Sequence, residues 1–226
     1  MVSKQFICLA NSRKLNGRCV AGIEIVDGKP AGWFRPVSDH GHGEVSETDR
    51  RYKDGSDPAL RDIIEAEFNE AKPHGHQPEN WLIDDRFYWV KKGRLKRAEL
   101  SAFVEAPGSL WGHGESTYNG CNDRLTPEAA EAFGESLKLI RVDKLNLKVF
   151  QPGLAFGYTK RRVQGRFHWG GRAYWLWVTD PIIEKAYLRK DDGEYALGPH
   201  YLTISIGEPD KGWCYKLIAA MIEEEQ

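Results

Sequence analysis

The sequence lacks most of the features that assign a protein to a class at first reading. Its 226 residues include only four cysteines, at positions 8, 19, 121 and 214, and no two of them form a CxxC pair. A zinc ribbon and a thioredoxin-type motif are therefore excluded. No apolar run approaches the roughly 18 residues of a membrane span, and the first residues contain no long apolar stretch of the signal-peptide kind. We expect a reduced, cytoplasmic protein with no membrane partner.

The chain also has no excess of charge of either sign. Lysine and arginine total 32 and aspartate and glutamate total 33, which gives a formal net charge of −1. Such a chain has no overall field that would attract nucleic acid or an anionic membrane. Any surface that binds nucleic acid must therefore be a local basic patch.

Sequence motifs give no case for an enzyme. The chain contains no GxSxG, no HExxH, no Walker A loop and no GxGxxG after a strand. The PCxxC motif of zinc deaminases is absent as well. Paired carboxylates such as Glu65 and Glu67 are typical of a solvated strand or helix face. The motifs therefore favour a protein that is not an enzyme, any catalytic residue stays unknown, and we expect no cofactor.

What the chain does have is hydrophobic residues in short, β-rich runs. Hydrophobic residues make up 41% of the chain and include eight tryptophans, enough for a packed core. In the first half, "FICLA", "CVAGIEIV" and "WFRPV" are expected strands separated by clusters of Asn, Gly and Pro. The stretch "DIIEAEF" fits a helix as well as a strand, and its pattern alone leaves both open.

The second half begins with the clearest helix signal and is then dense in β-strands. In "TPEAAEAFGES", Thr126 is the expected N-cap and Pro127 the first helical residue. The segment "RFHWGGRAYWLWV" predicts a hairpin with a Gly-Gly turn. We expect a mainly β protein with a few short helices, built as two small barrels in series. The expected division is 1–125 for the first barrel with its insert loops and 126–226 for the helix plus the second barrel.

Two pairs of histidines could suggest a metal site. His40 and His42 in "HGHGE", and His74 and His76 in "HGH", are spaced for side chains on one face of an extended segment. Four imidazoles could bind Zn²⁺ if the two loops met. However, such pairs in glycine-rich loops are usually only solvent-exposed, and no cysteine or acidic cluster accompanies them at ligand spacing. We expect no metal, and the roles of the four histidines stay open.

Three polar clusters could read a ligand. Amide, carboxylate and cationic side chains of this kind match the donors and acceptors of a nucleobase or a similar polar molecule. The alternative for each cluster is a turn held by its own Asn or Asp side chain. The candidates are Arg13 and Lys14 after the first strand, Gln77, Glu79 and Asn80 in "HQPENW", and Asn122, Asp123 and Arg124 behind a glycine-rich loop.

A fourth candidate surface mixes cations with aromatic residues in "TKRRVQGRFHWGGRAYWLW". Cations can follow a phosphate backbone while aromatic rings stack on bases, a mixture that suits single-stranded nucleic acid. Strand alternation puts Tyr174 on one face and Trp175 and Trp177 on the other, and one of these sets must be core. The residues expected to bind ligand are Arg161, Arg162, Arg166, Trp169 and Tyr174.

Several stretches together resemble the dual OB-containing domain proteins of prokaryotes. They are "ICLANSRKLNGRCVAG", "GWFRPVS", "HQPENWLI", "NDRL", "RFHWGGRAYWLWVTDP" and "YLTISIGEPDKGWCYKLIAAMI". The resemblance covers about residues 6 to 222. It implies two tandem OB-like small barrels packed together and a setting in prokaryotic defence or stress systems, and it brings no catalytic mechanism. It also favours a ligand-reading or loop-organising role for "HQPENW" over a metal site.

The sequence therefore predicts a non-enzymatic module that binds nucleic acid, preferably single-stranded, or a nucleotide-derived ligand. One alternative is an enzyme acting on nucleotides or nucleic acid, with Glu79 or Asp123 as general base. Another is a protein–protein adaptor whose partner is encoded in the same gene neighbourhood and whose aromatic strands are the main contacts.

Overall fold

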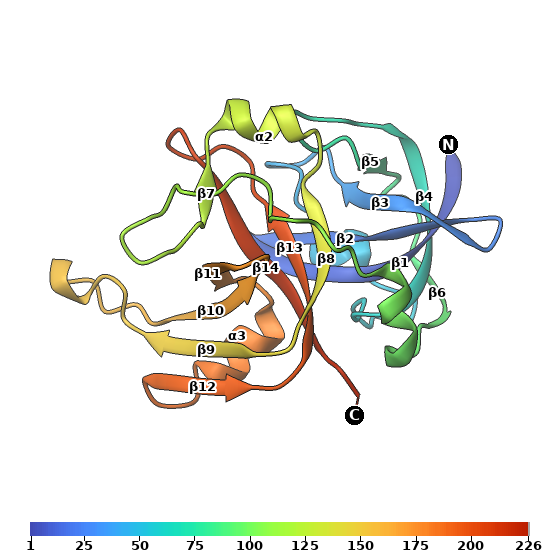
Figure 1. Cartoon of the computed structure of the whole chain (residues 1–226). Helices are drawn as coiled ribbons and strands as arrows, with labels where there is room; N and C mark the ends of the chain where they lie inside the picture. Colours follow the sequence, from blue (N-terminus) through green and yellow to red (C-terminus); the bar gives the residue numbers. More distant parts are fainter. Residues whose placement is uncertain (226) are drawn as a thin grey trace. The chain divides into compact units, whose positions relative to one another are not determined.

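The computed structural model describes residues 1–225 and is built mainly of β-strands (Figure 1). The chain divides into two compact units, Met1–Leu100 and Ser101–Gln226. Each unit has its own sheet and its own hydrophobic core. The expected boundary between the two barrels, at residue 125, stays a prediction. Within the described residues, no helix has the length and apolar character needed to cross a membrane.

The first unit is a closed five-stranded barrel with one additional strand. Around the barrel the order is β1-β2-β3-β5-β4, and β4 pairs back with β1. Only β3 and β5 run parallel; the other neighbours are antiparallel. The elements are β1 (Val2–Lys14), β2 (Gly17–Val26), β3 (Lys29–Val37), α1 (Glu47–Arg50), β4 (Asp62–Ala71), β5 (Asn80–Ile83), β6 (Val90–Arg94) and the 3₁₀ helix η1 (Arg97–Phe103).

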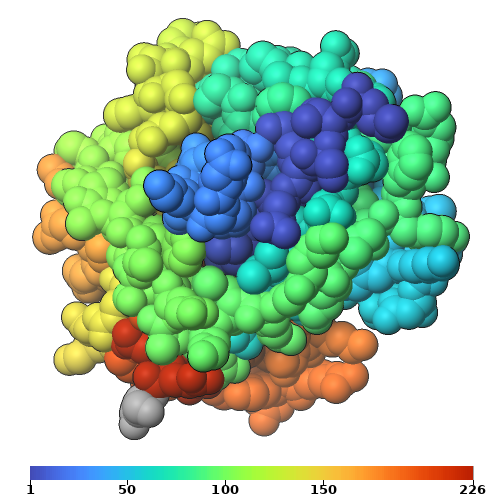
Figure 2. Space-filling view, turned by 90° about the vertical axis from the view of Figure 1, so that its right-hand side faces the viewer, coloured from blue at the N-terminus to red at the C-terminus, as the bar shows by residue number. Residues whose placement is uncertain are grey.

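Side-chain alternation explains the strand that the sequence left open. Ile64, Ala66 and Phe68 of β4 point into the core of the first unit, while the acids between them are half-buried. The segment "DIIEAEF" is therefore a strand. At the surface of this unit, Figure 2 shows the N-terminal end of β1 in dark blue and the exposed tip of the β2–β3 hairpin, residues 26–32, in lighter blue.

The second unit repeats this strand order with two bent strands. Its sheet runs β12-β9-β10-β11-β14-β13-β8, and β11 and β14 are its parallel pair. Strands β8 and β9 follow each other with only residues 143–144 between them, and β12 and β13 are separated only by residues 198–199. Taken as two bent strands, they give the order of the first barrel. Both units therefore have the five-stranded Greek-key arrangement of an OB-like barrel, as expected.

The elements of the second unit extend from the loop before its barrel to the C-terminal strand. They are β7 (Arg124–Leu125), α2 (Pro127–Phe133), β8 (Leu137–Val142), β9 (Leu145–Phe150), the 3₁₀ helix η2 (Leu154–Phe156), β10 (Arg162–Trp169), β11 (Arg172–Val178), α3 (Pro181–Tyr187), β12 (Gly193–Leu197), β13 (His200–Ile206) and β14 (Cys214–Glu223).

Local signals in the second unit agree with the structure at two places. Helix α2 begins after Thr126, whose side chain accepts from the backbone N–H of Ala129, and ends at Gly134 with φ of 62°. Strands β10 and β11 form the expected hairpin, and both turn glycines have positive φ, as a two-residue turn of this type requires.

Helix α3 and strand β12 were not expected, although Asp180-Pro181 is a cap followed by a first-turn proline.

Candidate ligand-binding face of the second barrel

The outer surface of the β10–β11 hairpin is where cationic and aromatic side chains meet. Strand alternation directs Trp175 and Trp177 of β11 away from the core, and Trp175 is 38% exposed. The antiparallel register places Arg166 opposite Trp175 and Gln164 opposite Trp177. In an OB-like barrel this hairpin corresponds to strands 2 and 3, the face on which such barrels bind oligonucleotides and oligosaccharides.

Two arginines of β10 lie against these two tryptophans. The guanidinium carbon of Arg162 is 3.9 Å from the ring centroid of Trp177, and that of Arg166 is 4.3 Å from the ring centroid of Trp175. The ring of Phe150, on the neighbouring strand β9, stacks on Trp177 at 5.8 Å between centroids and an interplanar angle of 23°. Attraction between a cation and the face of an aromatic ring holds each arginine in place.

The face carries more positive than negative charge. Arg166 donates from Nε to Gln164 Oε1 at 3.0 Å and from Nη1 to Glu194 Oε1 at 3.1 Å. Glu194 also lies 3.9 Å from Nζ of Lys148. Two cationic side chains, Arg166 and Lys148, therefore share one carboxylate, and that carboxylate is about half exposed. An anion could therefore displace Glu194 at little cost, because exposed ion pairs contribute little stability.

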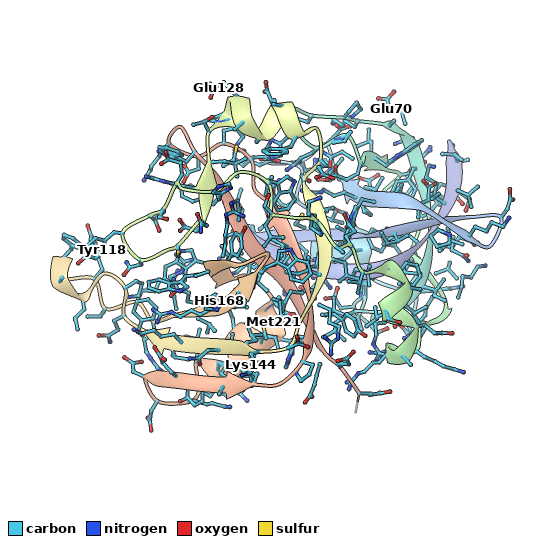
Figure 3. All side chains as sticks on the ribbon, viewed as in Figure 1. Glu70, Tyr118, Glu128, Lys144, His168 and Met221 are labelled. Carbon is cyan, nitrogen blue, oxygen red and sulfur yellow. The ribbon has the colours of Figure 1, made fainter. Side chains whose placement is uncertain are left out.

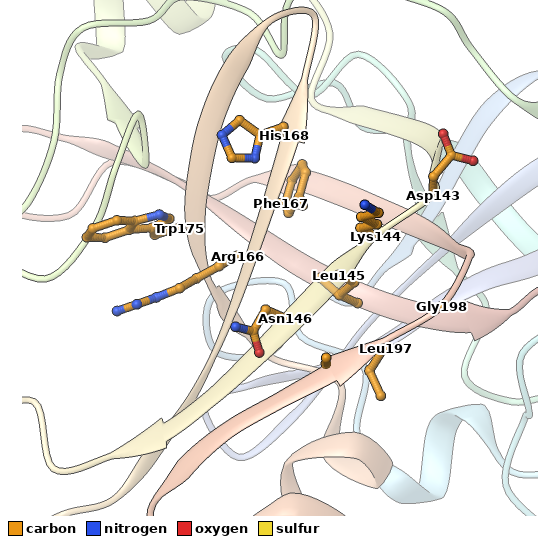
Figure 4. A pocket seen from close by; sticks show the side chains of 11 residues that line it. Asp143, Lys144, Leu145, Asn146, Arg166, Phe167, His168, Trp175, Leu197 and Gly198 are labelled. Atoms are coloured by element: carbon orange, nitrogen blue, oxygen red, sulfur yellow. The ribbon is translucent and has the colours of Figure 1, made fainter.

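A hollow of about 680 Å³ opens beside the Arg166–Trp175 pair and is called the larger hollow (Figure 4). Figure 4 shows the side chains of Arg166 and Trp175 next to each other on one side of the hairpin. Residues that line the larger hollow include Asn146, Arg166, His168, Trp175 and Ala196. Its size is in the range of pockets that hold small organic ligands.

A second hollow, of about 340 Å³, lies beside the Arg162–Trp177 pair and is called the smaller hollow. Its other walls come from the loop before β7 and from the β9–β10 loop that contains η2. Tyr118 of the first loop, labelled in Figure 3, meets Phe156 of the second edge-to-face at 6.1 Å. Residues that line the smaller hollow include Thr117, Tyr118, Asn119, Phe156, Arg162 and Trp177.

The side chains of Asn122 and Asp123 hold the loop before β7 rather than face a ligand. Asp123 accepts from the backbone N–H and from the hydroxyl of Thr117, at 2.7 and 2.6 Å, and is only 2% exposed. Asn122 donates to the carbonyl of Ala173 in β11 and accepts from the N–H of Gly114. These contacts favour the alternative interpretation of the cluster, a turn held by its own Asn and Asp side chains. They also fix the wall of the smaller hollow.

Lys216 of β14 supports the same loop from the inside, a role that the sequence gave no reason to expect. The residue is 1% exposed, and its ammonium group donates to the backbone carbonyls of Gly112 and Asn122. Burial lowers the pKa of Lys216 to about 8, and the charge of Asp123 opposes this shift only in part.

Two of the expected cations are engaged elsewhere. Arg161 donates to Asp192 at 2.6 Å and to two backbone carbonyls just after α3, so it joins the β9–β10 loop to that segment. Arg124 lies 3.8 Å above the ring of Trp213, in the β13–β14 loop. Of the expected arginines, Arg162 and Arg166 are the two that the structure brings together on the outer face.

Tyr174 requires a correction, because it lies in the core of the second unit. It is 0% exposed, stacks on Phe167, and its hydroxyl accepts from the backbone N–H of Leu110. Its ring therefore offers no face to a ligand, and the exposed aromatic residue of β11 is Trp175. Trp169 is half-buried and packs against the core, with Nε1 donating to the carbonyl of Pro107.

In the first unit, "HQPENW" spans the end of the β4–β5 loop and the start of β5, and its polar side chains turn inward. Gln77, Glu79 and Asn80 are 2%, 8% and 4% exposed. Glu79 forms an ion pair with Arg35 at 2.8 Å, and Asn80 donates to the side-chain oxygen of Gln77. These contacts favour the loop-organising role for the motif. The β4–β5 loop is one of the two loops with which OB-like barrels usually contact ligands, yet here its polar groups contact the protein itself.

Other candidates of the first unit lie near the ends of its strands. Arg13 and Lys14 end β1, and Lys14 donates from Nζ to the carbonyl of His42. His40 lies 3.6 Å from Asp85, and both side chains are largely exposed. Across residues 1–225, no group of three or more His, Cys, Asp or Glu side chains is placed to hold a metal ion.

Comparison with known proteins identifies a family. The family model described as "Dual OB-containing domain" matches residues 4–221, nearly the whole chain. No curated protein matches the chain, and no solved structure does.

Proposed function

The chain belongs to the dual OB-containing domain family, and from this premise we propose that its second barrel binds single-stranded nucleic acid or a nucleotide-derived ligand. The binding surface is the outer face of β10 and β11, with Arg162 and Arg166 as the cationic groups and Trp175 as the exposed ring. The protein acts as a binding module and not as an enzyme.

The observation that carries the proposal is the placement of two arginine–tryptophan pairs beside two hollows. Guanidinium groups bind phosphate, while aromatic rings and guanidinium planes stack on bases of any sequence. The surface is the one that OB-like barrels generally use for oligonucleotides. A base in a duplex is stacked on both faces, so an exposed ring such as Trp175 favours an unpaired strand.

Charge and burial set limits on this proposal. A net charge of −1 does not favour tight coating of long nucleic acid, so a short strand or a small ligand suits the local patch better. Glu79 and Asp123, the two candidate general bases, are both buried and engaged by protein groups. The cytoplasmic location expected from the sequence also belongs to the proposal. A role in prokaryotic defence or stress and a protein partner from the same gene neighbourhood belong to it through the family resemblance alone.

The test is binding of labelled oligo-dT, mixed single-stranded RNA and duplex DNA at low and moderate salt. We expect salt-sensitive binding to the single strands and weaker binding to the duplex. Arg166→Ala/Trp175→Ala should weaken single-strand binding at least tenfold, because stacking on one base alone contributes about 1–3 kcal/mol. Lys185→Gln, which removes one exposed charge from α3, is the control and should bind as wild type. No binding of any single strand at micromolar protein would overturn the proposal.

A further inference from the structure

The outer face of the second barrel presents the same chemistry at two places along β10. At each place an arginine lies on a tryptophan and a hollow opens beside the pair. Arg162 and Arg166 are four residues apart on one strand, which separates their Cα atoms by about 13 Å at 3.3 Å per residue. Two points of contact at this separation define a ligand of limited length.

The smaller hollow has the properties of a subsite for one base. Tyr118 and Phe156 are 83% and 68% exposed although they are large aromatic residues, and they stand on two different loops at the rim. Exposed apolar groups gathered around a hollow usually mark a binding site. Both Phe150 and Arg162 lie against the ring of Trp177, so the groups that a base would meet in this hollow are the guanidinium of Arg162 and the two rim residues.

The larger hollow provides the second subsite, with Trp175 as its ring and Arg166 as its cation. Stacked bases on one strand of B-DNA are about 3.4 Å apart. The Cα atoms of the arginines beside the two hollows are about 13 Å apart, well beyond this spacing, so bases in both hollows are not stacked neighbours and the strand between them must be extended.

We infer that the face binds a short single strand of two to three nucleotides, with one base in each hollow and phosphate at Arg162 and Arg166. The inference rests on the proposed function and adds to it a length and two subsites. A mononucleotide occupies one hollow only. A dinucleotide or trinucleotide engages both hollows. Once the first base is bound, binding of the second base is intramolecular, and this strengthens binding although neither hollow makes any additional contact.

The experiment measures Kd for thymidine monophosphate and for oligo-dT of two, three, five and eight nucleotides. We expect affinity to rise at least tenfold between the monophosphate and the trinucleotide. Between the trinucleotide and the octamer the gain should not exceed about sixfold, the number of registers in which a three-nucleotide site fits on eight nucleotides. The variant Tyr118→Ala/Phe156→Ala should bind the trinucleotide about as weakly as wild type binds the monophosphate.

Tyr158→Ala is the matched control, because Tyr158 is also aromatic, is 71% exposed in the same loop as Phe156, and does not line the smaller hollow. It should bind the trinucleotide as wild type. Equal affinity for monophosphate and trinucleotide, or a gain of more than an order of magnitude between trinucleotide and octamer, would overturn the two-subsite inference while leaving the proposed function intact. Binding of no strand of any length would overturn both.

Discussion

A buried lysine ties the wall of the smaller hollow to the barrel. Lys216 is 1% exposed, and its ammonium group contacts the backbone carbonyls of Gly112 and Asn122. Burial disfavours the charged form, and the pKa of Lys216 falls to about 8. The lysine is retained at a cost in stability near neutral pH, which is consistent with a role in positioning the loop that carries Tyr118.

This shift predicts how stability changes with pH. Between the folded pKa of about 8 and an unfolded pKa of about 10.4, the unfolded chain binds more protons at Lys216 than the folded chain does. The contribution of Lys216 to the free energy of unfolding therefore rises with pH across this window, by about 3 kcal/mol in total. Below pH 8 the contribution is constant.

Urea unfolding of wild type and of Lys216→Met from pH 7 to pH 10.5 checks this prediction. The difference in unfolding free energy, wild type minus variant, should grow in favour of wild type above pH 8. Other titrating groups cancel in that difference. A difference that stays flat, or that moves in favour of the variant, would contradict a lowered pKa for Lys216.

At the scale of elements, the hairpin β10–β11 shows what the sequence could and could not predict. The Gly-Gly turn and the alternation predict a hairpin with Tyr174 and Trp175 on opposite faces, but the ring expected to bind ligand, Tyr174, lies in the core. A two-residue turn fixes the register and puts Arg166 opposite Trp175. Residues directly opposite each other point to the same side of the sheet, and an arginine rarely points into a core. The pairing with Arg166 therefore indicates that Trp175 faces outward. Phe156 and Tyr118 could not be found in this way, since only the fold brings their loops together.

Strand β2 contains a glycine that the first barrel requires. A Cβ atom at Gly22 would lie 1.8 Å from the carbonyl oxygen of Ile7, beside the bulge at which β1 bends between its partners β4 and β2. The neighbouring atom is backbone and cannot move aside without shifting the strand.

Gly22→Ala should therefore lower the free energy of unfolding by about 2–3 kcal/mol or more. This is the upper part of the range usually found when an extra group is inserted into a packed core. Gly93→Ala in β6 is the control, because its Cβ would meet only a side-chain methyl group of Ile63 at an ordinary 3.8 Å. The control should change stability by less than about 1 kcal/mol. Thermal or urea unfolding of both variants gives the comparison, and equal stabilities would show that the bulge tolerates a side chain.

At the scale of the whole molecule, two barrels of the same strand order carry different outer chemistry. In the second barrel, Arg162 and Arg166 lie on rings beside open hollows. In the first barrel, Arg35 of β3 is neutralised by Glu79, with both side chains about 5% exposed or less. The tandem arrangement followed from the resemblance of the sequence to its family. The sequence could not predict which of the two barrels has an accessible face, because Arg35 and Glu79 are distant in the sequence and meet only in the folded chain.

This difference predicts separable effects of mutations on stability and on binding. Glu79→Met leaves the guanidinium of Arg35 buried without its carboxylate and should lower the free energy of unfolding by about 3–5 kcal/mol. The double variant Arg35→Met/Glu79→Met removes both charges and should recover most of that loss, since an apolar pair of similar volume often replaces a buried ion pair at little cost.

The double variant should also bind single-stranded oligonucleotide as wild type, because its changes lie in the first barrel and the proposed ligand contacts lie in the second. Unfolding curves for the single and double variants, with binding measured at a temperature where both are folded, separate the two effects. A double variant that unfolds like wild type but no longer binds would assign a ligand contact to Arg35 or Glu79. The "HQPENW" loop would then act in binding directly, and the division of roles between the two barrels would be wrong.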